Sequence, residues 1–86
     1  MNELAAEKIQ VYGADWCGMT KRSLALLDRL NVAYDYIDIE AQGNDEAAAW
    51  VRQQNDGKER KPTIKLKNLV LVEPSDAELE EAVQNN

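Results

Sequence analysis

The sequence predicts a single α/β domain built in the order βαβ-α-ββα. Three observations favour this fold class: apolar residues two apart before Gly13, leucines at helical spacing over residues 19–30, and the β-branched and aromatic run "VAYDYIDIE" over residues 32–40. A chain of 86 residues buries one small core and not two. We therefore expect residues 1–86 to form one domain.

The first half reads as strand, helix, strand. "KIQVY" (residues 8–12) is the first strand, and Asn31 is the expected end of the helix that follows. The helix is expected to place one set of residues toward the core, Leu24, Leu26, Leu27 and Leu30, and another set on its polar side, Lys21, Arg22, Ser23 and Arg29. A connection of this length is too long for a hairpin, which favours a parallel strand pair with a right-handed crossover.

The second half reads as helix, hairpin, helix. "NDEAAAWVRQQ" (residues 44–54) is a helix with Asn44 or Asp45 as N-cap and Trp50 as its main apolar anchor. "PTIKLKNLVLVEP" (residues 62–74) contains two short strands joined near Asn68, with Ile64 and Leu66 facing inward. The last helix begins with a capping box, Ser75 with Glu78, and is expected to bury Ala77, Leu79, Ala82 and Val83. A parallel pair with a hairpin gives a four-stranded mixed sheet flanked by helices.

Composition excludes several function classes. A net charge of −6 argues against nucleic-acid binding, and no apolar run is long enough to span a membrane. Residues 1–10 lack the pattern of a secretory signal, which together with a single cysteine favours the cytoplasm. Because the chain contains no histidine, a Cys/His nucleophile pair and an ordinary zinc site are both impossible, and we expect no metal. We expect a monomer.

The single cysteine, Cys17, lies where the first strand gives way to the first helix. A lone cysteine in such a protein is most often an inert small apolar residue. At a helix N-terminus, however, unpaired N–H groups favour an anion and lower the pKa of a thiol. Lys21, Arg22 and the loop "GKERK" (residues 57–61) add positive charge to the same region. The position of Cys17 therefore favours a reactive thiol over a residue that only packs in the core.

Four segments together resemble one known family. "DWCGMT" follows the first strand, "VAYDYIDIE" forms the second, "KPTI" stands in the place of a T-V-P segment, and "EPSDAEL" opens the last helix. From Lys8 to about Val83 the chain resembles a glutaredoxin of the short bacterial type that includes mycoredoxins. The resemblance implies a thioredoxin-like fold, with Cys17 as the exposed nucleophile and Pro62 as a cis-proline facing it. It implies a thiol–disulfide oxidoreductase that uses glutathione or another low-molecular-weight thiol on glutathionylated or otherwise thiolated proteins.

The active-site motif departs from the family's C-x-x-C, because Thr20 stands where the resolving cysteine would be. An internal disulfide cannot form, so a monothiol route remains, in which Cys17 takes over a small thiol and a second small thiol frees it. The Thr20 hydroxyl either donates a hydrogen bond to the Cys17 thiolate or caps the helix backbone.

The thiol-binding positions depart as well. Ala14 stands in place of a lysine, and Val72 with Glu73 replaces a Gly-Gly pair, so that the Glu73 carboxylate works against an anionic ligand. Arg60 and Lys61 are candidates to replace the missing cation, and glutathione, mycothiol and other small thiols stay open. The resemblance implies the following thiol-binding residues: Tyr12, Trp16, Arg60, Lys61, Pro62, Ser75 and Asp76.

Two other functions fit parts of the pattern. "CGMT" is similar to the C-G-F-S motif of monothiol glutaredoxins that hold a [2Fe–2S] cluster between two subunits with glutathione, although "GADW" is short for that group. A redox-silent binding module that recognises an extended peptide beside Pro62 is the other alternative.

Overall fold

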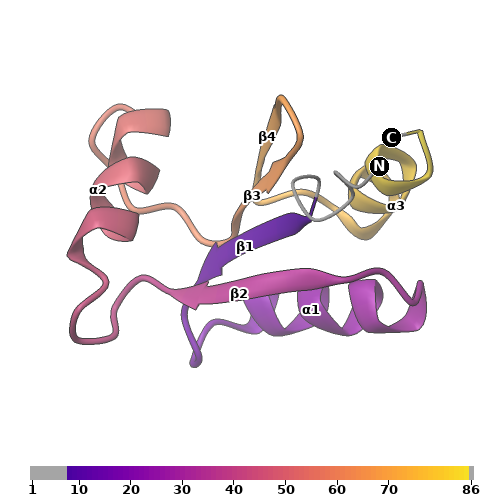
Figure 1. The fold of residues 1–86 in the computed structure, drawn as a ribbon, viewed down its shortest axis with the longest axis horizontal. Coiled ribbons are helices and arrows are strands. Elements are labelled where there is room, and N and C mark those ends of the chain that lie inside the picture. Colours follow the sequence, from indigo (N-terminus) through magenta and orange to yellow (C-terminus); the bar gives the residue numbers. More distant parts are fainter. Residues whose placement is uncertain (1–7, 86) are drawn as a thin grey trace.

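The computed structural model describes residues 8–85 and has the predicted order of elements (Figure 1). The elements are β1 (Ile9–Gly13), α1 (Gly18–Arg29), β2 (Tyr34–Asp38), α2 (Asp45–Gln54), β3 (Thr63–Leu66), β4 (Leu69–Val72) and α3 (Asp76–Gln84). Strand ends differ from the expected ones by one or two residues, as is usual where ladders fray into loops. The expectation that no secretory signal is present falls on residues 1–7, outside the described residues.

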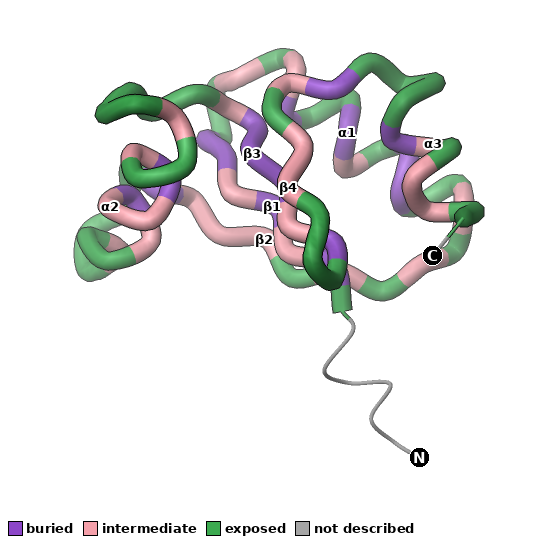
Figure 2. The backbone as a smooth tube through the Cα atoms, turned by 90° about the horizontal axis from the view of Figure 1, so that it is seen from above, coloured by how far each residue is buried: buried purple, intermediate pink, exposed green. Residues whose placement is uncertain are grey.

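The sheet has the order β2-β1-β3-β4. The predicted parallel pair is β1 with β2, in which Val11 lies beside Tyr36, and β1 is antiparallel to β3, in which Val11 lies beside Ile64. The predicted hairpin is β3 with β4, joined by the two residues between Leu66 and Leu69. The mixed four-stranded sheet is therefore confirmed, with the central strands β1 and β3 more deeply buried than the edges (Figure 2).

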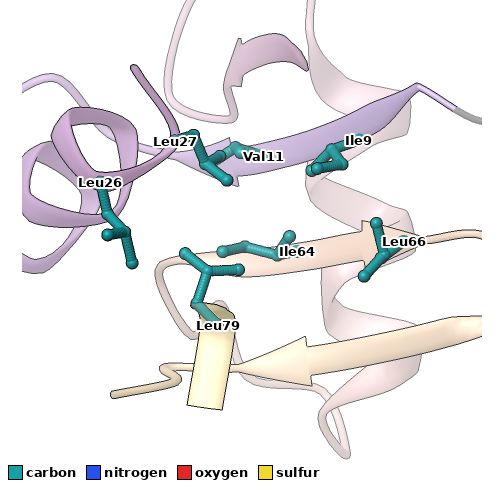
Figure 3. Packing of buried hydrophobic residues seen from close by; sticks show 7 residues of the cluster. All are labelled: Ile9, Val11, Leu26, Leu27, Ile64, Leu66 and Leu79. Atoms are coloured by element: carbon teal, nitrogen blue, oxygen red, sulfur yellow. The ribbon is translucent and has the colours of Figure 1, made fainter. Parts of the chain in front are cut away.

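Helices cover both faces of the sheet. Because side chains alternate along a strand, Val11 points to one face and Tyr12 to the other. The first face packs against α1 and α3 and forms the main core (Figure 3), whose buried members are Ile9, Val11, Leu26, Leu27, Ile64, Leu66 and Leu79. On the second face α2 forms a smaller cluster from Ile39, Ala48 and Val51, against which Tyr12, Ala47 and Trp50 pack.

Three expectations about burial are wrong. The helical pattern predicts Ser23 on the polar side of the first helix, but it is 3% exposed, because it lies one turn before Leu26 and Leu27 on the buried face of α1. Ala77 is exposed, since it lies in the first turn of α3 only two residues before the buried Leu79, which puts it on roughly the opposite face of the helix. Trp50 is only half-buried; Ala48 and Val51 anchor α2, and the indole stacks on Tyr12 with ring centroids 4.7 Å apart.

The predicted capping box at the start of α3 is confirmed and permits a stability test. The Ser75 hydroxyl accepts a hydrogen bond from the Glu78 N–H at 3.1 Å, and the Ser75 N–H donates to the Glu78 carboxylate at 2.8 Å. Ser75→Ala is expected to lower the free energy of unfolding by about 1 kcal/mol, measured by urea denaturation, because one helix N–H loses its partner. Ser75→Thr retains the acceptor and serves as control; an unchanged midpoint in Ser75→Ala would contradict the assignment.

Candidate active site

Cys17 occupies the N-cap position of α1, as predicted from the sequence. Its backbone is extended, with φ −83° and ψ 119°, and its N–H donates to the Ala14 carbonyl at 3.1 Å, which closes the turn after β1. Its own carbonyl accepts from the Lys21 N–H at 3.1 Å and begins the helix. The half-buried thiol is therefore held at the end of α1 where N–H groups lack helical partners.

The thiol faces the segment that leads into β3. Cys17 Sγ lies 3.9 Å from the Lys61 carbonyl oxygen, to which the thiol donates, and the peptide bond between Lys61 and Pro62 is cis. Burial alone would raise the pKa of Cys17, but hydrogen bonds from the Thr20 hydroxyl and from the N–H groups of Thr20 and Met19, with the charge of Lys61, outweigh it. The pKa of the thiol is lowered overall, so a larger share is thiolate at neutral pH.

Thr20 lies behind the thiol with 1% of its surface exposed. Its Oγ1 accepts a hydrogen bond from the Ala14 N–H at 3.4 Å, so the hydroxyl proton remains available for the sulfur. A hydroxyl that accepts from the turn and donates to the thiolate fits the first of the two roles considered for it. Cys17 holds the N-cap position of α1, and its side chain makes no cap hydrogen bond.

One further residue joins the site from the end of β2. The Trp16 Nε1–H donates to Glu40 Oε1 at 2.7 Å, Lys61 Nζ lies 3.6 Å from Glu40 Oε2, and the same ammonium lies 5.6 Å from the centroid of the Trp16 ring. We call these three residues the Trp16–Glu40–Lys61 cluster. Sequence analysis missed Glu40; the available signal was its place after the second strand of a parallel pair, because the carboxyl ends of such strands meet at one edge of the sheet.

The expectation that basic residues lower the pKa of Cys17 is confirmed for Lys61. Lys61 is the cation that lowers the pKa of Cys17, whereas Lys21 and Arg22 lie exposed on α1. Arg60 forms an ion pair with Glu73 at 3.7 Å. Glu73 adopts φ 49°, in the left-handed region that favours glycine, and it stands where the family has a Gly-Gly pair.

Other residues predicted to bind the small thiol make contacts away from the Cys17 sulfur. Tyr12 stacks on Trp50 and donates to Gln10 at 3.3 Å, which ties it to the α2 side of the sheet. The Glu73 N–H donates to the Pro62 carbonyl at 2.8 Å, and this hydrogen bond holds the segment before α3 beside the cis peptide bond. The structure thus brings Thr20, Lys61 and the cis peptide bond before Pro62 to Cys17. The thiol-binding roles stay predictions for all the residues named for them: Tyr12, Trp16, Arg60, Lys61, Pro62, Ser75 and Asp76.

Within residues 8–85, His, Cys, Asp and Glu side chains form no group of three or more that could hold a metal ion. Within the same residues, each helix is too short or too polar to cross a membrane.

A half-buried thiol with a lowered pKa, on this sheet and opposite a cis-proline, defines the class of thioredoxin-like redox proteins. Residues 9–69 match the sequence model described as glutaredoxin, and the chain belongs to the glutaredoxin family. It is a thiol–disulfide oxidoreductase. The family uses glutathione-type thiols and acts on thiolated or glutathionylated proteins.

Individual relatives agree with this assignment. Mycoredoxin 1 of Corynebacterium glutamicum is 35% identical over 57 residues, which cover 66% of this chain and 67% of the relative. The crystal structure of a glutaredoxin from Methanosarcina mazei Go1 superposes with a TM-score of 0.74 at 28% identity, covering 88% of this chain and 77% of the other. A glutaredoxin from Archaeoglobus fulgidus gives a TM-score of 0.79 at 20% identity, covering 94% and 90% of the two chains, and supports the fold.

The hydrogen bond from Thr20 can be tested through the reactivity of the thiol. Thr20→Val removes the hydroxyl at nearly constant volume, and we expect alkylation of Cys17 by iodoacetamide at neutral pH to slow by roughly threefold to tenfold, because the thiolate loses a charge-assisted hydrogen bond. The pH midpoint of the alkylation rate should move upward, since a lost thiolate partner raises the pKa. Thr20→Ser retains the hydroxyl and should behave like the wild type; a pH profile identical in both variants would contradict the role of the hydroxyl.

Proposed function

We propose that this protein is a monothiol oxidoreductase that reduces mixed disulfides between proteins and a small thiol through Cys17. In the first step the Cys17 thiolate attacks the small-thiol sulfur, the protein thiolate leaves and takes a proton, and Cys17 now carries the small thiol. In the second step another small-thiol thiolate attacks that disulfide and releases the Cys17 thiolate with a small-molecule disulfide. Each step breaks one S–S bond and forms another.

The observation that carries this proposal is the environment of Cys17. Local hydrogen bonds and the charge of Lys61 lower the pKa of Cys17 in a chain that has no histidine to act as its base. Thr20 at the fourth motif position leaves no second thiol to attack the mixed disulfide, so release depends on an external thiol. These two facts support the monothiol route.

The binding roles extend the same proposal. The backbone at Lys61 and Pro62 holds the cysteinyl part of the small thiol beside Sγ, and Trp16 covers it from the exposed side. The N-terminus of α3, with Ser75 and Asp76, receives the more distant part of the ligand through backbone N–H groups. Arg60 and Tyr12 complete the proposed contacts. We place the protein in the cytoplasm as a monomer, with small-thiol-modified proteins as partners and no metal.

The test is steady-state reduction of a glutathionylated peptide by the reduced protein, with glutathione and glutathione reductase regenerating the thiol. Sustained turnover that depends on glutathione concentration supports the proposal. One stoichiometric release of peptide without turnover shows a nucleophile that glutathione does not recycle, and the assay is then repeated with another small thiol. Failure to release the peptide even once would overturn the proposal.

A further inference from the structure

The two cations beside the cis peptide are already paired with carboxylates, and this feature bears on which small thiol the proposed function uses. Lys61 Nζ lies 3.6 Å from Glu40, and Arg60 Nη1 lies 3.7 Å from Glu73. These are the side chains that sequence analysis offered as replacements for a missing carboxylate-binding lysine. A cation already in an ion pair attracts a second carboxylate much less, because the incoming ligand also meets the first carboxylate.

Glu40 is fixed in place by the chain around it. The Ile39 N–H donates to the Gly13 carbonyl at 2.9 Å, which extends the β1–β2 pairing, and the Glu40 N–H donates to the Asp38 carboxylate at 2.9 Å. The Asn44 amide donates to the Asp38 carbonyl at 2.8 Å and closes this loop. Ile39 is buried against α2, and the neighbouring Glu40 carboxylate is held toward Trp16 by the hydrogen bond that it accepts from the indole.

The partner of Glu40 is also restrained. The Lys61 side chain is only 14% exposed, and its ammonium donates to the Glu59 carbonyl at 3.0 Å in addition to meeting Glu40 and the Trp16 ring. Glu40 is 41% exposed, so the difference between the pairs lies in the cation: Arg60 is 46% exposed and Glu73 36%, and solvent reaches the Arg60–Glu73 pair from both sides. Glu40 should therefore have the larger effect on charge at the site, and Glu73 the smaller one.

We propose that Glu40, supported by Glu73, is a specificity-determining residue that neutralises the cations beside Cys17, so that the site favours disulfides of uncharged small thiols over those bearing carboxylates. The substrate class is a small thiol without a carboxylate near its sulfur. The inference rests on the proposed function, because it concerns the ligand that Cys17 exchanges.

The test measures the second-order rate constant for a single reaction of reduced Cys17 with three symmetric disulfides. The probes are bis(2-hydroxyethyl) disulfide, which is neutral, 3,3′-dithiodipropionate, which is dianionic, and cystamine, which is dicationic. The readout is the ratio of the anionic to the neutral rate constant, because any change in the pKa of Cys17 acts on all three probes. We expect the wild type to react with the anionic probe most slowly.

Glu40→Gln retains an acceptor for the Trp16 Nε1–H and removes one charge. We expect it to raise the anionic-to-neutral ratio by about threefold to fivefold at low salt, and added salt to reduce the gain. Glu73→Gln should raise the ratio by less. The control is Glu81→Gln, an exposed acid on α3 outside these ion pairs, which makes the same change in net charge and should leave the ratio nearly unchanged.

The outcomes separate the two proposals. Equal ratios in the wild type, Glu40→Gln and Glu81→Gln would overturn the specificity inference while Cys17 still exchanges with each probe. An equal gain in Glu40→Gln and Glu81→Gln would assign the effect to net charge and would also overturn it. Failure of reduced Cys17 to react with any of the three probes would instead reject the proposed function.

Discussion

Cys17→Ser is expected to abolish mixed-disulfide exchange, with a loss of at least about 1,000-fold in the rate of peptide release, because the hydroxyl of serine is not ionised at neutral pH without a base. The chain contains no histidine that could act as this base. The hydrogen bonds from Thr20 and Met19 lower the pKa of the Cys17 thiol. The pKa of a serine hydroxyl is so much higher that the same hydrogen bonds would leave it protonated at neutral pH.

The measurement is release of a fluorescent peptide from its glutathione disulfide, with mass spectrometry of the protein after the reaction. Wild-type protein should gain the mass of one small thiol on Cys17, and Cys17→Ser should gain none. Serine is nearly isosteric with cysteine, and the Cys17 side chain makes no cap hydrogen bond, so the variant should keep its stability. Residual turnover in Cys17→Ser would show that the reaction does not pass through this residue.

The same assay and one reconstitution experiment separate the other two functions considered for the sequence. A wild-type thiol that forms no mixed disulfide would favour a redox-silent binding module. A brown, dimeric protein after anaerobic reconstitution with iron, sulfide and glutathione would favour cluster binding, since each subunit has one cysteine to give. A colourless protein that exchanges small thiols agrees with the proposal.

The order of elements was predictable because each has a local signal. Leucines at helical spacing mark α1, β-branched and aromatic residues mark β2, and Ser75 with Glu78 marks the start of α3. The position of Cys17 at the helix N-terminus follows from the same signals, because it depends only on where β1 ends and α1 begins. Hydrophobic periodicity and capping depend on residues only a few positions apart, so the helices and strands that they specify can be predicted from the sequence alone.

The contacts that shape the site were not predictable, because they join residues far apart in the chain. Glu40 meets Trp16 across 24 residues, and the sequence around it reads only as the exposed end of a strand. The hydroxyl of Ser23 suggests exposure, whereas its burial depends on which face of α1 meets the rest of the fold. The stacking of Tyr12 on Trp50 likewise depends on where α2 crosses the sheet.

Gly13 lies against Thr20, a residue of the next element, and substitution of this glycine is expected to cause the largest change in stability. Gly13 is the last residue of β1, and its carbonyl accepts from the Ile39 N–H, so the backbone there cannot move without disturbing the parallel pair. A Cβ atom at this position would lie 2.5 Å from both Thr20 Oγ1 and Thr20 Cγ2. Thr20 is buried and cannot turn away into solvent.

Gly13→Ala is therefore expected to lower the free energy of unfolding by about 2 to 3 kcal/mol, through overpacking in a rigid part of the fold. Urea denaturation followed by tryptophan fluorescence measures the change. Gly18→Ala is the matched control, since a Cβ at Gly18 meets no atom within 4 Å, and it should be neutral or slightly stabilising.

A second substitution tests the cause of the loss. Thr20→Ala removes Oγ1 and Cγ2, the two nearest atoms, but leaves Thr20 Cβ at 3.0 Å from the added methyl group. Alone it should destabilise the fold, because the Ala14 N–H loses its acceptor. Combined with Gly13→Ala it should cost less than the sum of the two single changes, with a coupling of at least about 1 kcal/mol. Strict additivity would show that the methyl group clashes elsewhere. Coupling would show that Gly13 leaves the space in which the Thr20 side chain sits behind the Cys17 thiol.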